Sequence, residues 1–255
     1  MLNALVFLFG AIIGSFLNVC IVRIPEKKSL VLDSSRCVYC GKRLGIIDLV
    51  PLLSFLWLGG KCRHCKASLS WRYFVVELLT GLLFLLIFTR YGFEPQTLFY
   101  FILASLLVVV AFIDIKHRII PNGLVMAGIA TALPANIFGV NISFLEGLYG
   151  ALAGGGILGV IALASILLLK KEGMGGGDIK LMAMAGLFIG WQMTLLSLVM
   201  AVYLATIVIL PLIVLKKLKR GDHIPFGPFL SAGVIMALLY GNEIMLWYLR
   251  CFFLL

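Results

Sequence analysis

Two acidic residues lie at the edges of long apolar segments, where an ionisable side chain is costly. Asp114 ends one uncharged segment, and Asp178 follows a run of glycines and precedes another. Acids in such places are functional hypotheses by default. Two carboxylates that share one proton can activate a water molecule against a peptide carbonyl. The sequence therefore predicts an aspartate dyad. The alternative is two independent interfacial acids, neutralised by Lys116 and Lys180.

The glycines before Asp178 indicate how a substrate could approach it. Gly175 and Gly177 lack Cβ atoms, so the backbone there can come close to an extended substrate and can adopt unusual angles. No Gly-Lys-Ser/Thr follows the run, which excludes a phosphate-binding loop. Lys180 comes shortly after Asp178. It either orients the carboxylate or the substrate backbone, or is a simple interfacial lysine.

The expected helix ends give the two acids unequal roles. Asp114 lies toward a helix C-terminus, where the helix dipole disfavours negative charge, and Asp178 lies at an N-terminus, where it is favoured. We therefore expect Asp114 to hold the shared proton and Asp178 to begin the reaction ionised. Because the two groups titrate as a unit, this describes one microstate of the pair.

Four cysteines form two Cys-x-x-Cys pairs, Cys37 with Cys40 and Cys62 with Cys65. Two such knuckles can complete a closed tetrahedral zinc site, which we expect to be structural. Disulfides are the competing interpretation, but the loop is expected in a reducing compartment. His64 lies between two ligand positions and is either a competing ligand or an exposed loop residue.

The composition identifies the class of protein that must hold these groups. Of the 255 residues, 62% are hydrophobic and 13% are charged, whereas a soluble domain carries about 25% charged residues. Disorder, a coiled coil and a secreted disulfide scaffold are thereby excluded. We predict an all-α polytopic membrane protein with about eight transmembrane helices and one cytoplasmic zinc-knuckle loop.

Stretches with at most one charge set the expected membrane spans. They are 1–22, 73–89, 97–113, 119–145, 147–169, 181–215 and 224–249. The run 181–215 is too long for one span, since about 20 residues cross a bilayer core. We expect a turn near Gly190 to divide it into a short helix and a full one. The short helix would leave room for water near Asp178.

The net charge of +10 follows from topology. With eight spans, every Lys and Arg except Arg90 and Arg250 falls on one side of the membrane, and the positive-inside rule makes that side cytoplasmic. Both chain ends are then expected outside the cytoplasm, and no nucleic-acid partner is needed. The expected organisation is a first transmembrane helix at 1–22, a cytoplasmic loop at 23–72 and a seven-helix membrane core at 73–255.

Taken together, these motifs resemble those of the type IV prepilin peptidases, membrane aspartic proteases of the GxGD type. The resemblance covers nearly the whole chain and rests on the order and spacing of its motifs. They are Gly14-Ser15-Phe16-Leu17-Asn18-Val19, Arg23-Ile24-Pro25, the two knuckles, Arg72-Tyr73 with Glu77, Asp114 with Ile120-Pro121-Asn122, Gly175-Gly176-Gly177-Asp178-Ile179-Lys180, and Ile224-Pro225-Phe226-Gly227-Pro228-Phe229.

This resemblance implies an enzyme of the bacterial inner membrane with its active site at the cytoplasmic face. Such enzymes cleave the short basic leader of prepilins and pseudopilins, typically after glycine and before phenylalanine. Members with the large cytoplasmic loop often also methylate the new N-terminal amine, using S-adenosylmethionine. The expected partners are these substrates and membrane lipid. The sequence gives no S-adenosylmethionine motif that can be placed.

Two other functions compete with this interpretation. A proton-coupled transporter would also use paired acids, but it predicts acids near the bilayer midplane and internal repeats. A zinc-knuckle scaffold without catalysis predicts that both aspartates can be replaced without effect. Glu77 and Asn18 are further polar residues near the cytoplasmic edge. We expect interhelical hydrogen bonds from both, with a part in methyl transfer as the alternative.

Overall fold

The computed structural model describes residues 1–30, 36–37, 39–170, 174–217 and 224–253. Residues 31–35 and 38 of the expected cytoplasmic loop lie outside this range. The described chain is helical, and its extended pairing is confined to two isolated bridges. It forms two compact units, Met1–Thr97 and Leu98–Leu255.

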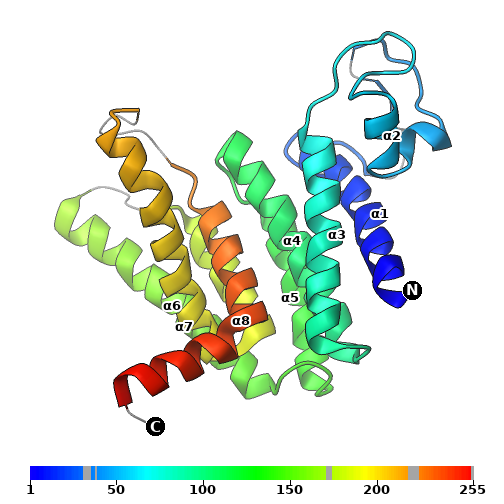
Figure 1. Cartoon of the computed structure of the whole chain (residues 1–255). Helices are drawn as coiled ribbons and strands as arrows, with labels where there is room; N and C mark the ends of the chain where they lie inside the picture. Colours follow the sequence, from blue (N-terminus) through cyan, green and yellow to red (C-terminus); the bar gives the residue numbers. More distant parts are fainter. Residues whose placement is uncertain (31–35, 38, 171–173, 218–223, 254–255) are drawn as a thin grey trace. The chain divides into compact units, whose positions relative to one another are not determined.

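The first unit is built on two antiparallel apolar helices (Figure 1). α1 spans Leu2–Arg23 and α3 spans Arg72–Tyr91, and the two pack against each other. Glycines allow the close approach: a Cβ on Gly10 would lie 2.8 Å from Phe84 Cβ, and one on Gly14 would lie 2.8 Å from Glu77 Cα. Small residues at the contact are the usual means of packing helices in lipid, where apolar burial between helices gives little driving force.

The loop between α1 and α3 holds a 3₁₀ turn, Ile46–Leu49, and the short helix α2, Leu53–Trp57. Phe55 of α2 is buried and stacks against Trp71 and Phe74, with ring centroids 5.1 and 5.6 Å apart. These aromatic contacts fix α2 against the start of α3. The loop therefore has a small core of its own, within the same unit.

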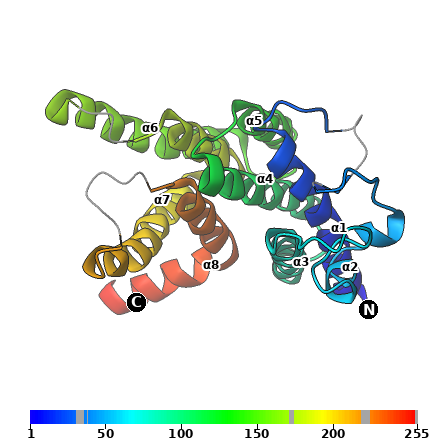
Figure 2. The same ribbon diagram turned by 90° about the horizontal axis from the view of Figure 1, so that it is seen from above.

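The second unit contains five helices. They are α4 (Pro95–His117), α5 (Asn122–Ile137), α6 (Phe144–Leu169), α7 (Gly176–Val214) and α8 (Gly227–Phe253). α7 packs against α5, α6 and α8, and Figure 2 shows it running between α6 and α8. Gly150 of α6 and Gly186 of α7 bring their backbones together, while a Cβ on Gly154 would lie 2.5 Å from Met182 O.

α7 is broken at the predicted place. Gly190 has φ 74° and ψ 173° inside the 39-residue helix, a conformation that favours glycine. The break deprives carbonyls before it of their helical donors, and asparagine side chains replace them. Asn136 Nδ2 donates to Leu187 O at 2.7 Å, and Asn141 Nδ2 donates to Phe188 O at 2.9 Å. Buried backbone groups within a membrane need such partners.

These helices confirm the predicted class, an all-α polytopic membrane protein. Six helices of the described chain are long and apolar enough to cross a membrane: α1, α3, α4, α6, α7 and α8. α5 is a shorter apolar helix of 16 residues. Counting α5, and α7 as two helices divided at Gly190, gives the eight apolar segments that were expected.

Candidate active site and metal centre

Helix ends of the second unit meet around two carboxylates. α4 carries Asp114 in its last turn, and α7 carries Asp178 in its first. α8 begins at Gly227, which contacts Asp114, and α5 begins at Asn122, which contacts the first turn of α7. Residues far apart in the sequence thus form one cluster because their helices end at the same place.

Asp114 is buried, with 6% of its surface exposed. Its Oδ2 accepts the backbone N–H of Gly227 at 2.9 Å. The bond comes from the first residue of α8, where unpaired N–H groups point out of a helix. Gly227 must lack a side chain here, because a Cβ would lie 2.7 Å from that same oxygen. The carboxylate is therefore held in one orientation by backbone.

Asp178 is half-buried, and its carboxylate lies within electrostatic range of Asp114. Its backbone N–H bonds to Gly175 O at 3.1 Å, which closes the first turn of α7. The two acids that the sequence singled out therefore lie in one region of the second unit. Their role as a pair that shares a proton, and the assignment of that proton, stay predictions.

The residues Gly175, Gly176 and Gly177 have ordinary backbone angles and do not use the freedom that glycine permits. Gly175 is extended, with φ −71° and ψ 135°, and Gly176 and Gly177 begin α7. The missing side chains leave space instead. A Cβ on Gly177 would lie 3.0 Å from Ile120 Cβ, whereas one on Gly176 would meet no atom of the described residues within 4 Å. The run lets the α4–α5 connection lie against the helix start.

Lys180 is exposed, and its Nζ donates to Asn122 Oδ1 at 3.2 Å. Within the described chain it forms no ion pair with Asp178. If the two acids were independent and each neutralised by a lysine, Lys180 would pair with Asp178. The described chain does not show that pair. Lys180 instead ties the start of α7 to the start of α5.

The four predicted metal ligands converge in the first unit. The Sγ atoms of Cys37, Cys40, Cys62 and Cys65 all lie within 4.8 Å of one another, and those of Cys37 and Cys65 are 3.8 Å apart. All four are free thiols, so the disulfide alternative is not what the structure shows. His64 is exposed and lies outside the cluster.

The two knuckles are built alike. In the first, Cys37 N–H donates to Lys42 O and Gly41 N–H donates to Cys37 O, both at 2.9 Å. In the second, Cys62 N–H donates to Ala67 O at 2.9 Å and Lys66 N–H to Cys62 O at 3.0 Å. Each tight turn presents two thiols to the same point.

The thiols of Cys37 and Cys65 differ in pKa because their backbone and thiol neighbours differ. The backbone N–H groups of Cys40 and Tyr39 lower the pKa of the Cys37 thiol to about 6. At Cys65 the backbone of Ala67 lowers the pKa, but partial removal from water and the three other thiols outweigh it and raise the pKa to about 11. Of these two thiols, Cys37 is therefore the one that is ionised near neutral pH.

The donor set fits a metal ion. Four thiolates in tetrahedral array at about 2.3 Å from zinc would be about 3.8 Å apart, which matches the Cys37–Cys65 separation. Soft sulfur ligands in this geometry favour zinc or iron–sulfur centres over magnesium or calcium. The cluster is therefore compatible with a zinc knuckle.

The other polar residues of interest lie in the first unit. Asn18 Nδ2 donates to Tyr73 O at 3.1 Å, an interhelical bond from α1 to α3 as expected. Glu77 of α3 likewise bonds to the Ser15 side chain of α1, as expected, and its Oε2 also accepts the backbone N–H of Leu52 at 2.8 Å. The bond joins α3 to the cysteine-bearing loop, and Leu52 has φ 62°, a conformation costly for a branched side chain.

Sequence reasoning missed three of these partners. Gly227 was seen only as part of a motif, and Asn122 and Leu52 were given no contact. A glycine just before a proline and an apolar helix is a weak signal of a helix start. Nothing in the sequence pairs that start with Asp114.

The chain matches two family descriptions along its length. Residues 8–91 match the bacterial Peptidase A24 N-terminal domain, and residues 101–210 match the type IV leader peptidase family. The first match covers the cysteine centre, and the second covers both aspartates. No solved structure matches the chain.

Curated relatives align with nearly the full chain. A relative from Aeromonas salmonicida (strain A449) is 35% identical over 96% of this chain and 93% of its own length. One from Pseudomonas aeruginosa is 35% identical over 95% and 92%, and one from Bacillus subtilis is 33% identical over 97% and 98%. Each is named prepilin leader peptidase/N-methyltransferase. On this evidence, the chain belongs to the type IV leader peptidase family.

Proposed function

We propose that this protein is an aspartic endopeptidase of the bacterial inner membrane. It removes the basic leader of type IV prepilins and pseudopilins at the cytoplasmic face, with Asp114 and Asp178 as catalytic residues. The observation that carries the proposal is the meeting of these two acids at helix ends, with Asp114 fixed by the Gly227 N–H. The family assignment and the names of the relatives point to the same activity.

The pair supplies both proton transfers of peptide hydrolysis. The ionised carboxylate takes a proton from water as the water oxygen attacks the scissile carbonyl carbon, while the protonated acid gives its proton to the carbonyl oxygen. When the tetrahedral intermediate collapses, the C–N bond breaks and the amine leaves with a proton. Because Oδ2 of Asp114 already accepts the Gly227 N–H, Oδ1 is the oxygen left to exchange protons.

The cytoplasmic placement rests on charge. The ends of α4 and α7 that carry the acids also carry Lys116 and Lys180, and the excess of basic residues on that side marks it as cytoplasmic. On this topology the chain divides into 1–22, 23–72 and 73–255. A substrate leader lies in the cytoplasm while its apolar helix stays in the bilayer.

Two features support the substrate class. Acidic groups suit a basic leader, since opposite charges favour encounter. Gly176 leaves open space beside the acids, where an extended peptide can lie with its backbone near Asp178. Membrane lipid is the solvent of the substrate helix, and nucleic acid has no role in this chemistry.

The same chain is proposed to methylate the new N-terminal residue. The relatives carry N-methyltransferase in their names, and the large cysteine-bearing loop belongs to the bifunctional members. S-adenosylmethionine, when bound, supplies an electrophilic methyl group. The amine nitrogen would form the new C–N bond as the methyl–sulfur bond breaks and S-adenosylhomocysteine leaves, and the product ammonium would release one proton.

The metal of this loop is proposed to be structural zinc, held by Cys37, Cys40, Cys62 and Cys65. Four thiolates close the coordination sphere and leave no open position for water or substrate. The ion would join two turns that hold few other contacts. Gly175, Gly177 and Lys180 are proposed to support the aspartate pair by shaping the start of α7, not by touching the reacting atoms.

The transporter alternative has no observation in its favour. A carrier would place its acids at mid-helix, whereas both acids here lie at helix ends. The scaffold alternative is decided by experiment, because it requires that the aspartates be dispensable.

The test is cleavage of a purified prepilin by purified enzyme, followed by mass spectrometry. We expect Asp114→Asn and Asp178→Asn each to reduce the cleavage rate at least roughly 10³-fold. Glu94→Gln is the matched control, since Glu94 is an exposed acid elsewhere. Leader removal at the wild-type rate by either aspartate variant would reject the protease assignment.

A further inference from the structure

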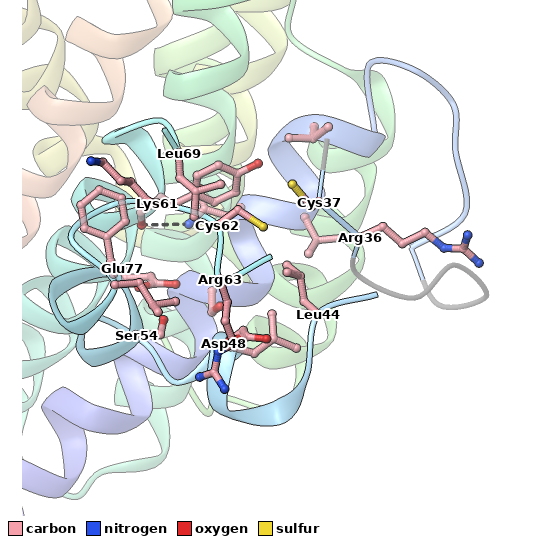
Figure 3. A pocket seen from close by; sticks show the side chains of 18 of the residues that line it. Arg36, Cys37, Leu44, Asp48, Ser54, Lys61, Cys62, Arg63, Leu69 and Glu77 are labelled. Carbon is pink, nitrogen blue, oxygen red and sulfur yellow. Dashed lines mark hydrogen bonds and ion pairs between the residues drawn. The ribbon is translucent and has the colours of Figure 1, made fainter. Parts of the chain in front are cut away.

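The first unit contains a cavity of about 380 Å³ that the peptidase chemistry does not use. It lies between the end of α1, the cysteine-bearing loop and the start of α3, and Figure 3 shows its labelled side chains. Its volume falls in the range of about 300–1,000 Å³ typical of small-molecule sites. The cavity belongs entirely to Met1–Thr97.

One wall holds a buried polar atom without a partner. Asn18 is 2% exposed; its Nδ2 donates to Gly14 O and Tyr73 O, but its Oδ1 has no hydrogen-bond partner among the described residues. A buried acceptor left unpaired costs about 1–3 kcal/mol. Because Asn18 lines the cavity, a ligand that donates a hydrogen bond there would remove this cost.

The same cavity is lined by a buried acid. Glu77 is 8% exposed and accepts hydrogen bonds from the Leu52 N–H and the Ser15 side chain, yet within the described chain it forms no ion pair. A buried carboxylate is costly unless a cation or further donors accompany it. Asn18 and Glu77 therefore both favour a ligand with a cationic, hydrogen-donating end.

The rest of the lining suits a ligand of mixed character. Phe16, Phe55 and Leu58 supply apolar surface for a flat ring. Cations for a carboxylate come from Arg23, Arg36, Lys61 and Arg63. Arg63 is paired with Asp48 at 2.8 Å, and Figure 3 shows the two side chains together. A phosphate-rich ligand would leave Glu77 without a cation, and a lipid chain would leave Asn18 unsatisfied.

We propose that this cavity binds S-adenosylmethionine, with Glu77 and Asn18 Oδ1 facing its cationic methionine portion. The inference rests on the proposed methyl transfer and names the site for it. The sulfonium and ammonium groups match Glu77, the ammonium and the adenine amino group are donors, and the adenine ring matches the aromatic and aliphatic walls. Cys37 and Cys62 also line the cavity, so the metal knuckle shapes the site that holds the methyl donor.

The test measures binding directly on the purified full-length protein. Equilibrium dialysis with radiolabelled S-adenosylmethionine gives Kd for wild type, Glu77→Gln, Val19→Phe and the control Glu94→Gln. Gln keeps an acceptor for the Leu52 N–H while removing the charge, and Phe fills a wall of the cavity. We expect Kd to rise at least about tenfold in both cavity variants and to stay at the wild-type value in the control.

Ultraviolet crosslinking of the same radiolabelled compound gives a readout that needs no variant. The labelled peptide is expected within residues 15–77, and S-adenosylhomocysteine in excess is expected to prevent the labelling. Zinc content and leader cleavage by each preparation distinguish a damaged site from a damaged fold. A label confined to residues 98–255, or unchanged Kd in both cavity variants, would overturn the inference.

Failure of the inference differs from failure of the methyltransferase function. If wild-type protein methylates cleaved pilin while both cavity variants bind normally, the function stands and this site is wrong. If wild-type protein neither binds the compound nor methylates, both are wrong. Cleavage without methylation would leave the peptidase proposal untouched.

Discussion

The cysteine centre and the aspartate centre are built by opposite means. Each cysteine pair is presented by one tight turn with its own backbone hydrogen bonds, so only two short segments must meet. The aspartates are brought together by the ends of separate helices, and Asp114 is oriented by Gly227, 113 positions away. A local motif carries its geometry in its spacing, whereas a long-range site takes its geometry from helix packing.

The two centres should therefore fail in different ways. Damage to a knuckle removes a ligand and the structure that depends on the metal. Damage around the aspartates leaves the helices in place and displaces a carboxylate. The following predictions test this difference, starting with the largest effect.

Replacing Cys37 and Cys40 together by Ser should abolish metal binding, because structural zinc contributes about 10–16 kcal/mol to the folding of small sites and half of its ligands are gone. Bound zinc, measured by atomic absorption, should fall from about one ion per chain to near zero. Methylation should be lost, and leader cleavage should fall less than methylation. Stoichiometric zinc in the variant would show that these cysteines are not ligands.

Gly227→Ala should impair cleavage while leaving the metal in place. The new Cβ would lie 2.7 Å from Asp114 Oδ2, so the carboxylate must move. A displacement of a catalytic group by about 1 Å can reduce the rate about 10²-fold. The control is Gly123→Ala, where a Cβ would meet nothing within 4 Å. Cleavage by Gly227→Ala at the rate of Gly123→Ala would contradict the positioning role of this bond.

Zinc binding to the metal-free protein should release protons in a pH-dependent number. Because the pKa of Cys37 is lowered to about 6, its thiol is already ionised above that pH and has no proton to release when zinc binds. Calorimetry in buffers of different ionisation enthalpy should therefore give about one proton fewer per zinc ion at pH 7.5 than at pH 5. The affinity should fall as the pH drops through 6. The same number of protons at both pH values would show that Cys37 is not ionised beforehand.

The smallest effect concerns one position that differs between the knuckles. Gly41 has φ 68° and Lys66, its counterpart, has φ 59°; left-handed angles cost an L-residue about 1–2 kcal/mol. Lys66→Gly should therefore stabilise the loop by up to about 1 kcal/mol, and Gly41→Lys should destabilise it by about as much. Thermal unfolding of the zinc-loaded protein would detect both changes in stability. If the two variants changed the stability in the same direction, the knuckles would not be equivalent.

The sequence predicted what spacing and hydropathy can encode. The helical class, the break at Gly190 and the convergence of the four cysteines all follow from local patterns. The placement of Asp114 and Asp178 near the same helix ends was expected from counting the spans and from the family's motifs, and their pairing stays a prediction. The choice of hydrogen-bond partners did not follow, because Glu77 could have bonded to any nearby donor and finds Leu52 in the loop. The ordinary angles at Gly175 could not be predicted either, since a glycine permits unusual geometry without requiring it.

The position of both acids at helix ends has a consequence for the substrate. A peptide bond inside a helix is shielded, because its carbonyl already accepts a hydrogen bond from four residues further on. A protease whose carboxylates stood at mid-helix would have to unravel its target within lipid before cutting it. If Asp114 and Asp178 cut as proposed, their position where helices end suits a scissile bond that lies outside the substrate's own helix, so that no helix has to be melted first.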